Sequence, residues 1–308
     1  MIIVGGENLM DMIQTGRQNN NALFEAVPGG SPYNLAMAVG RQNIAVSYMT
    51  PISRDSSGDQ LAEKLVESRV NLRGPRVSAP TSIGLVSIED GAPSYAFYRE
   101  GTAERLITLD HLEASLTDDV SVFHIGSLGL TGGNDAIVWE EFAKRAKNRG
   151  IKLSIDPNVR PSLISDPSTY RSRITRLIAM ADILKLSDED LAWLYCGMNE
   201  SESLMELTAN TSADVIILTK GADGSAVQHN DVWHDAPSHP VGAISDTIGA
   251  GDTYMASILV WLTQNLKLAR LSELSLQDKQ QMQHYAGRAA ALNCARQGCN
   301  PPWADELR

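Results

Sequence analysis

The strongest constraint on the fold is a repeated alternation between short runs of β-branched residues and longer helical stretches. Such runs are typical of strands buried in a parallel sheet, and the stretches between them suit crossover helices. The predicted strands are Met1–Val4, Val120–Ile125, Lys152–Ile155, Ile183–Leu186 and Val215–Leu218. The predicted helices are Ala136–Arg149, Ser172–Met180, Thr253–Leu268 and Gln277–Arg296. We therefore expect an α/β fold in which a central, mostly parallel sheet carries helices on both faces.

Two segments interrupt this alternation. Residues 9–27 and 81–107 have alternating strand character, the second with a turn at 89–91, and neither is followed by a crossover helix. We interpret them as a small antiparallel β lid over a crevice at the carboxyl ends of the parallel strands. No linker or repeat divides the chain, so residues 1–308 are expected to form a single domain that includes both lid segments. The exposed edges of such a lid predict a homodimer that pairs two lids.

Composition excludes several classes of protein. Hydrophobic residues make up 43% of the 308 residues, which excludes wholesale disorder. The formal net charge is −11, so the surface repels phosphate backbones and anionic lipids. Neither nucleic acid nor a membrane is therefore an expected partner. The three cysteines form no disulfide framework, and we expect a cytoplasmic protein.

The stretch that carries the most chemistry is Asp246–Tyr254, with the sequence DTIGAGDTY. Its Gly-Ala-Gly turn precedes a long apolar helix, and free amides at a helix start attract anions. Asp252 lies inside this cradle, where a carboxylate disfavours resting phosphate. The position suits a base that takes a proton from a hydroxyl while the amides hold a transferring phosphoryl group. The alternative is a simple helix N-cap made by Asp252 and Thr253.

These residues resemble the C-terminal signature of the ribokinase-like (PfkB) carbohydrate kinases. The stretch Pro28–Ala36, with Gly58 downstream, is similar to the N-terminal signature of the same family. Further stretches resemble fructokinases, most of all bacterial ones: Gly6–Asp11, Phe97–Ala103, Asp156–Arg160 and Leu292–Pro301. The resemblance covers nearly the whole chain in the same order. It implies ATP-dependent phosphorylation of a small sugar, with D-fructose converted to fructose 6-phosphate as the first candidate.

By this resemblance, Asp252 would be the base that deprotonates the sugar hydroxyl. The backbone amides of Gly249, Ala250 and Gly251 would form the anion hole. Arg160 would place a fixed positive charge near the phosphates, in a loop that Pro157 and Pro161 rigidify. Its alternative role is a surface ion pair.

The resemblance also assigns a sugar site and a nucleotide site. The sugar-site positions are Asp11, Gly29, Gly30, Asn34, Phe97 and Arg99. Asp11 and Asn34 would bind sugar hydroxyls, the glycines would let the ring approach the backbone, and the last two would close over it. For Phe97, packing of the lid against the core is nearly as good an explanation. The nucleotide positions are Thr219, Gly221, Gly224 and Asn293. Asn293 would face the purine; alternatively, it would cap a helix or pack in the interior.

Two cations are implied by the same resemblance. Many family members have an Asn-x-x-Glu element that organises Mg²⁺ through water, and here the corresponding stretch is Ser187–Asp190. Asp190 would take the place of the glutamate. A monovalent cation, K⁺, would lie next to the anion hole. Its ligands would be Asp246 and the Ile248 carbonyl, with backbone carbonyls near Arg296 and Gly298.

Other functions remain to be weighed. Within the same family, 2-keto-3-deoxygluconate or a riboside or nucleoside is an alternative substrate. An acidic sugar would need an extra cation in the lid and a heterocycle an aromatic surface. The lid supplies one arginine and one aromatic residue, so the sequence does not decide between these substrates. A different class of protein would be a sensor that binds sugar or nucleotide without turnover. The presence of Asp252 argues against it, because a binder needs no base. The chain lacks G-x-x-x-x-G-K-[ST], a G-x-G-x-x-G after its first strand, and HExxH.

Overall fold

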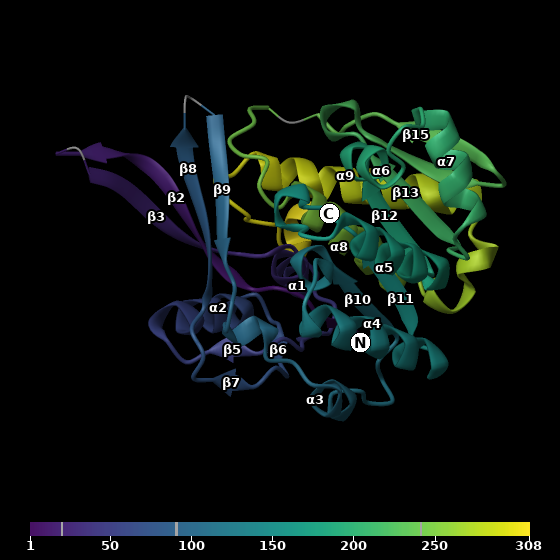
Figure 1. Ribbon diagram of the computed structural model, residues 1–308. Coiled ribbons are helices and arrows are strands. Elements are labelled where there is room, and N and C mark those ends of the chain that lie inside the picture. Colours follow the sequence, from purple (N-terminus) through teal and green to yellow (C-terminus); the bar gives the residue numbers. More distant parts are fainter. Residues whose placement is uncertain (20, 90–91, 241) are drawn as a thin grey trace.

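A nine-stranded sheet forms the centre of the protein in a computed structural model that describes residues 1–19, 21–89, 92–240 and 242–308 (Figure 1). From one edge to the other its strands are β15 (Val232–Ala236), β14 (Ser225–His229), β13 (Val215–Thr219), β12 (Ile183–Ser187), β11 (Lys152–Asp156), β10 (Val122–Gly126), β1 (Ile2–Val4), β4 (Val46–Tyr48) and β6 (Asn71–Leu72). The pairs β13–β14 and β14–β15 are antiparallel and the other pairs are parallel. The expected mostly parallel sheet is confirmed.

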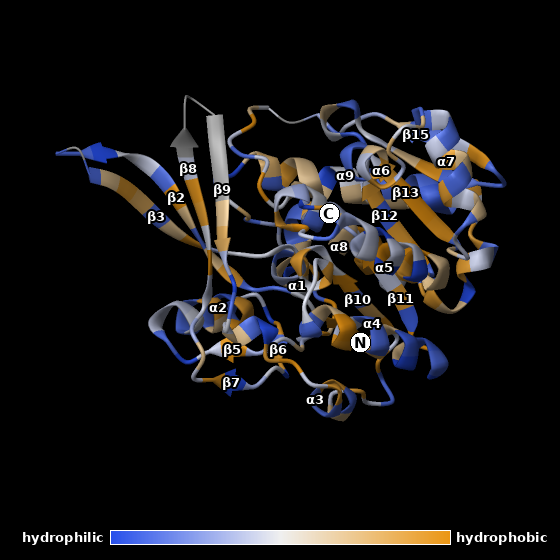
Figure 2. Ribbon diagram, in the orientation of Figure 1, coloured by the Kyte–Doolittle hydropathy of each residue, from blue (hydrophilic) through white to orange (hydrophobic). Residues whose placement is uncertain are grey.

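Helices cover both faces of this sheet. One hydrophobic core contains residues of α1 (Ser31–Arg41), α2 (Ser56–Glu67), α8 (Ala250–Gln264) and α9 (Leu276–Cys294). The other contains residues of α3 (Leu109–Ala114), α4 (Asn134–Asn148), α5 (Pro167–Met180), α6 (Asp188–Leu194) and α7 (Glu200–Ala209). In β1, Ile2 and Val4 face the first core and Ile3 faces the second, as the two-residue repeat of a strand requires. Figure 2 shows the hydrophobic strands between the two helical layers.

The lid consists of two hairpins, β2 (Leu9–Gln18) with β3 (Asn21–Gly29) and β8 (Ser82–Glu89) with β9 (Ala92–Tyr98). Each hairpin is antiparallel, as expected, but their inner strands β2 and β8 pair in parallel. The sheet therefore differs from the prediction at this central pair, because both strands leave the main body in the same direction (Figure 1). The predicted turn at 89–91 includes residues 90 and 91, which lie outside the described residues.

Short elements complete the chain. A second small sheet pairs β5 (Ile52–Ser53) with β7 (Arg76–Val77). The short 3₁₀ helices are η1 (Ala103–Arg105), η2 (Ser127–Leu130), η3 (Pro161–Leu163), η4 (Gly221–Asp223), η5 (Leu268–Glu273) and η6 (Ala304–Leu307). In the described part of the chain, no helix combines the length and the apolar character needed to cross a bilayer.

The strand order places the candidate site. From β1 the chain goes first to β4 and β6 on one side, and then returns to β10 on the other side. Such a reversal opens a crevice at the carboxyl ends of the strands. Residues that follow β1, β11 and β12 therefore meet at one edge of the sheet, beneath the lid.

Candidate active site

Asp252 lies in the first turn of α8 and is 7% exposed. Ser31 Oγ donates a hydrogen bond of 2.7 Å to its Oδ1, and Asn34 Nδ2 donates one of 2.8 Å to its Oδ2. The N-cap of α8 is Gly249, with no side-chain capping bond. The carboxylate is thus held by α1 across the crevice, and the alternative of a simple N-cap is not supported.

Burial raises the pKa of Asp252 above its ordinary value. The hydrogen bonds from Ser31 and Asn34 oppose this rise, and so do the positive charges of Lys185 and Arg160. The result is a carboxylate that is shielded from water and yet surrounded by groups that favour its charged form. Such a group is well suited to accept a proton in a closed site.

Glu7 fixes the start of α1 by accepting backbone hydrogen bonds. Gly30, with a φ of 116°, is the N-cap of α1, and a proline occupies its first turn, where the missing N–H costs nothing. The Ser31 amide donates to Glu7 Oε1 at 2.9 Å, and the Gly129 amide donates to Glu7 Oε2 at 3.3 Å. Sequence reasoning missed Ser31 and Glu7, although both lie in stretches that carried the family resemblance.

The turn before α8 requires glycine at 249. Its φ of 74° is left-handed, and a Cβ there would collide with the side chain of Cys299. The Ala250 amide donates to the Thr247 carbonyl at 3.2 Å. The first-turn amides of Gly251 and Asp252 have no acceptor within an α-helix and lie at the positive end of its dipole. This geometry can receive an anion next to the Asp252 carboxylate.

Asp11 occupies a slot between two glycines of the lid. A Cβ at Gly29 or at Gly84 would collide with its carboxylate, and one at Gly84 would also lie 3.1 Å from Cε1 of Phe97. Burial raises the pKa of Asp11 to about 6, against the opposing charge of Arg160. Gly84 was not among the predicted residues, because a glycine in a strand gives no signal of what lies beside it.

Arg160 lies in the loop after β11 and is exposed. Its Nη1 donates to the carbonyls of Asn158 and Val159, at 3.4 and 3.1 Å. The loop is tied to β12 by Asp190, whose Oδ1 accepts from the Val159 amide at 2.7 Å and whose Oδ2 accepts from the Ser187 amide at 2.9 Å. The guanidinium is free of ion pairs within the described residues, and its charge acts on both Asp11 and Asp252.

Arg99 differs from the expectation. It is 8% exposed and binds Glu104 through two hydrogen bonds, of 2.8 Å from Nε and 3.1 Å from Nη2. Its Nη1 donates to the Leu128 carbonyl at 3.1 Å. The guanidinium therefore anchors the base of the lid, and a direct contact between Arg99 and a sugar is not supported by its placement.

The nucleotide-site residues fall into two groups. Gly221 and Gly224 have φ values of 52° and 98° and make a tight turn after β13, where the Thr219 hydroxyl donates to the Leu186 carbonyl at 3.3 Å. Asn293 is fully buried, and its Nδ2 donates to the Ile248 carbonyl at 2.8 Å. Its Oδ1 accepts from the backbone amide of residue 300 at 2.9 Å. Asn293 thus supports the loop before α8, which favours the packing alternative.

Asp246 joins the two segments that were predicted to hold a monovalent cation. Its Oδ1 accepts from the Ile248 amide and its Oδ2 from the Gly298 amide, both at 3.0 Å. The described residues contain no group of three or more His, Cys, Asp or Glu side chains that is placed to hold a metal ion.

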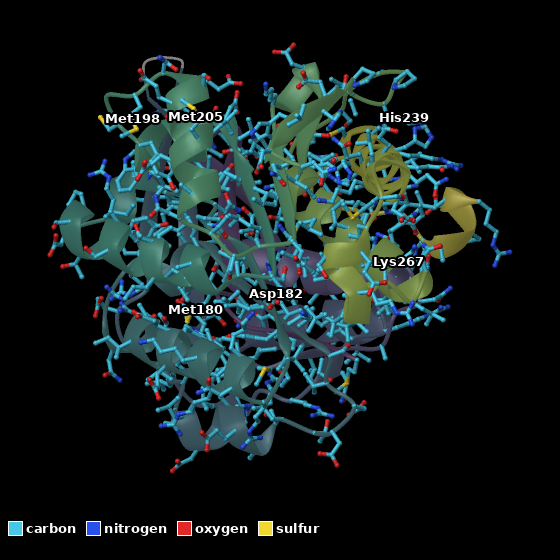
Figure 3. The ribbon with its side chains drawn as sticks, turned by 90° about the vertical axis from the view of Figure 1, so that its right-hand side faces the viewer. Met180, Asp182, Met198, Met205, His239 and Lys267 are labelled. Carbon is cyan, nitrogen blue, oxygen red and sulfur yellow. The ribbon has the colours of Figure 1, made fainter. Side chains whose placement is uncertain are left out.

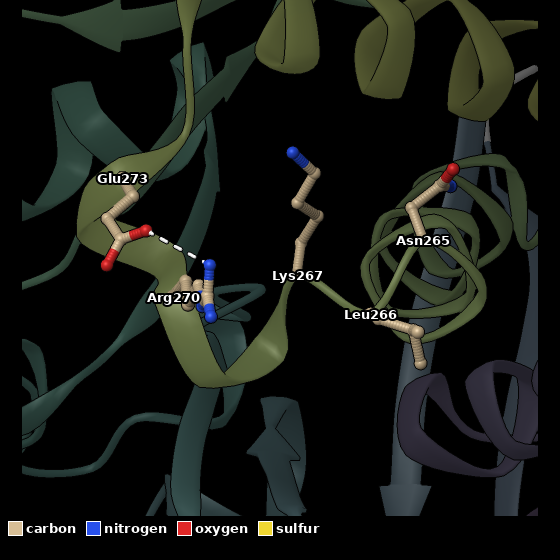
Figure 4. Close-up of a pocket in the computed structure, with 5 residues that line it drawn as sticks. All are labelled: Asn265, Leu266, Lys267, Arg270 and Glu273. Carbon is tan, nitrogen blue, oxygen red and sulfur yellow. Dashed lines mark ion pairs between the residues drawn. The ribbon is translucent and has the colours of Figure 1, made fainter.

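Two surface hollows lie away from these residues. One, of about 370 Å³, is lined by Asn265, Leu266, Lys267, Arg270 and Glu273, at the opposite end of α8 from Asp252 (Figure 4). Its cations are paired: Lys267 with Asp278 at 3.1 Å and Arg270 with Glu273 at 3.8 Å. The other, of about 510 Å³, includes Met205, which lies apart from Lys267 in Figure 3. The described residues that line them include none of the predicted site residues.

Comparisons with known proteins identify the family and the fold of this chain. The model of the pfkB family of carbohydrate kinases matches residues 1–305. A fructokinase of Rhizobium leguminosarum bv. trifolii is 34% identical over 91% of this chain and 85% of its own length. The crystal structure of Xylella fastidiosa fructokinase with bound ATP has a TM-score of 0.90 at 28% identity, covering 99% of this chain and 96% of that one. Aminoimidazole riboside kinase of Salmonella enterica shares the fold, with a TM-score of 0.83 at 20% identity over 99% and 98% of the two chains.

Proposed function

Since this chain belongs to the pfkB family of carbohydrate kinases, we propose that it transfers the γ-phosphoryl group of ATP to D-fructose and forms fructose 6-phosphate. The observation that carries the proposal is the Asp252 carboxylate. It is buried, held by Ser31 and Asn34, and located at the positive end of α8. The similarity to fructokinases favours fructose over the other candidate sugars.

In the proposed reaction, Asp252 accepts the proton of the sugar hydroxyl as that oxygen attacks the phosphorus. The new O–P bond forms, the bond from the phosphorus to the β-phosphate oxygen breaks, and ADP leaves. Amides of the turn 249–251 and the first turn of α8 stabilise the negative charge on the transferring group. Arg160 adds a positive charge from the opposite loop.

The sugar would be held by Asp11 and Asn34. Oδ1 of Asn34 is buried and lacks a hydrogen-bond partner among the described residues, so this acceptor still needs a donor, and a sugar hydroxyl would supply one. Asp11 faces the same region from the lid, beside Phe97. Closure of the lid over the sugar would exclude water and so suppress wasteful hydrolysis of ATP.

The turn at Gly221–Gly224 would border ATP, which when bound supplies the phosphoryl group. Mg²⁺ would accompany the phosphates. Asp190 fits an indirect role through water, because both of its oxygens already accept hydrogen bonds from backbone amides.

For K⁺, the carboxylate of Asp246 and the Ile248 carbonyl offer oxygen ligands in the loop before α8. Turnover in K⁺ compared with Na⁺ at constant ionic strength tests that site.

A homodimer through the lid is the proposed assembly. Strand pairing places Phe24, Ile83 and Tyr98 on the lid face opposite Asp11, and they are 37%, 38% and 62% exposed. Changing Tyr98→Glu would place a charge in the shared face and yield monomers in light scattering. Leu266→Glu is the control, since Leu266 is 86% exposed at the far end of α8. A monomeric parent protein at micromolar concentration would contradict the dimer.

The substrate is tested by measuring ADP release with ketoses, aldoses, sugar acids and nucleosides. We expect the highest kcat/KM with fructose. A higher value for 2-keto-3-deoxygluconate or for a riboside would reassign the substrate within the family. Changing Asp252→Asn should lower kcat by about 10³-fold while fructose binding, measured by calorimetry, is largely kept. Unchanged turnover in this variant would remove Asp252 from the mechanism, and absence of turnover with every sugar would favour the sensor.

A further inference from the structure

We propose that Lys185 is a positioning residue for phosphoryl transfer: its buried ammonium, anchored by Asp156, lies beneath the Gly251 turn and keeps Asp252 charged. The inference rests on the proposed function, because it concerns the group proposed as the base. Neither Lys185 nor the carboxylate of Asp156 was assigned a role from the sequence.

The two residues form a buried ion pair across neighbouring strands. Asp156 ends β11, Lys185 lies in β12, and Nζ of Lys185 is 2.8 Å from Oδ2 of Asp156. Their side chains are 5% and 2% exposed. A buried pair of this kind is a poor source of stability, since the desolvation of both charges offsets their attraction. A role in the site explains why the charges lie there.

The ammonium lies against the first turn of α8. A Cβ built on Gly251 would lie 3.3 Å from Nζ of Lys185 and 4.0 Å from its Cε. Residue 251 is the immediate neighbour of Asp252, so the cation is under the same turn that holds the base. A side chain at 251 would be in tight contact with this ammonium.

Lys185 is the buried cation among three carboxylates. Asp156, Asp190 and Asp252 all act to raise the pKa of its ammonium, and they outweigh the burial that would lower it. Lys185 therefore stays protonated. Oδ1 of Asp156 has no partner among the described residues, and burial raises the pKa of Asp156 to about 6 although Lys185 opposes the rise.

Asp252 is surrounded by groups from several elements. Ser31 and Asn34 face it from α1, Lys185 from β12 and Arg160 from the loop after β11. The negative charge of Asp252 also acts on the Asp156 carboxyl and on the buried Cys299 thiol. Of the two cations, Arg160 is exposed and screened by water, whereas Lys185 is dry. Lys185 is therefore the stronger candidate for keeping Asp252 deprotonated.

The test compares two variants that differ only in the charge at 185. Asp156→Asn removes the buried carboxylate, and adding Lys185→Met to it removes the ammonium without leaving an unpaired buried charge. The readout is kcat at saturating fructose as a function of pH, which reports the enzyme–substrate complex. We expect the acid limb of the double variant to lie about one pH unit above that of Asp156→Asn alone. Lys185→Arg in the same background should restore it.

Lys279→Met is the matched control. Lys279 is also a buried lysine, but it donates to the carbonyls of Asp214 and Gln228, away from the site. Its loss should lower the unfolding temperature and leave the acid limb in place. Coincident acid limbs for Asp156→Asn and the double variant would overturn the inference. If the kcat of Asp252→Asn is about 10³-fold lower in the same assays, coincident acid limbs leave the proposed function intact, whereas unchanged turnover in Asp252→Asn would remove Asp252 from the mechanism itself.

Discussion

Ser31 Oγ donates a 2.7 Å hydrogen bond to Oδ1 of Asp252, although 221 positions separate the two residues in the chain. The bond joins the first residue of α1 to the first turn of α8, and it leaves the Asp252 carboxylate with a fixed orientation. Asn34, one turn further along α1, holds the other oxygen. The stretch that resembles the N-terminal family signature therefore orients the residue supplied by the stretch that resembles the C-terminal one.

Removing the Ser31 hydroxyl should weaken the proposed base. In Ser31→Ala, one of the hydrogen bonds that lower the pKa of Asp252 is lost, so this pKa rises further. We expect kcat at pH 7 to fall about tenfold, with the acid limb displaced to higher pH. Ser56→Ala is the control, because Ser56 is the exposed first residue of α2. An unchanged pH profile in Ser31→Ala would show that the bond does not tune Asp252.

A methyl group at 84 should disturb sugar binding. In Gly84→Ala the new Cβ would displace the Asp11 carboxylate and press on Phe97. We expect the KM for fructose to rise about tenfold with a smaller change in kcat. Gly16→Ala is the matched control on the neighbouring strand β2, where a Cβ would meet nothing within 4 Å. Equal KM values for the two variants would place the sugar away from Asp11.

Neutralising Asp11 should stabilise the protein while impairing binding. The pKa of Asp11 is about 6 in the folded state against an ordinary 3.8, so folding disfavours its charged form above pH 6. In Asp11→Asn, the free energy of unfolding should exceed that of the parent by about 1–2 kcal/mol at pH 7.5. The gain should shrink as the pH falls from 6 to 4, because Asp11 is then protonated in the folded state and increasingly protonated in the unfolded state. Urea unfolding at pH 7.5 and at pH 4 measures this gain in the free energy of unfolding. Calorimetry with fructose should show weakened affinity. A gain that is equal at both pH values would contradict the assigned pKa.

Loss of the Arg99–Glu104 pair should loosen the base of the lid. Arg99→Ala leaves Glu104 buried without its partner, and we expect a loss of about 3 kcal/mol in urea unfolding. The double variant Arg99→Met with Glu104→Leu, an apolar pair, should recover most of the lost free energy of unfolding. Its KM for fructose should stay within a few-fold of the parent value. Arg145→Ala is the control, because Arg145 makes exposed pairs on α4 and its loss should change little. A large rise in KM for the apolar pair would mean that Arg99 reaches the sugar after all.

Much of the fold could be predicted from the sequence because its central strands are mostly apolar. The five predicted strands correspond to β1 and β10 to β13 within two residues at each end. The helices α1 and α2 were not predicted, although both lie near the site. The stretch Pro28–Ala36 was interpreted as a family signature in which the Gly29 and Gly30 backbone approaches the sugar, and the helix that begins at Ser31 was overlooked. The parallel pairing of β2 with β8 depends on contacts between segments about 70 residues apart, which local patterns do not encode.

The candidate site shows the same limit. Asp252, Asn34 and Asp11 were predicted from motifs, since their residue types carry the chemistry, and the structure places Asn34 against Asp252 and Asp11 beside two glycines. The partners of Arg99 and Asn293 could not be predicted, because a motif gives the type of residue at a position and not the direction of its side chain. Lys185 was missed for a related reason. A single lysine in an apolar strand has no distinguishing pattern, and its meaning comes from Asp156 on the adjacent strand and from the turn above it.

Helix α8 carries Asp252 on its first turn and is buried without interruption from there to Leu262. The carboxylate proposed as the base is therefore set in a helix of the hydrophobic core, whereas Asp11, Gly84 and Phe97 belong to a projecting sheet. Evolution can reshape such hairpins with small effects on the interior. A change in these hairpins can thus alter the preference for one acceptor over another while the proposed base keeps its place in the core.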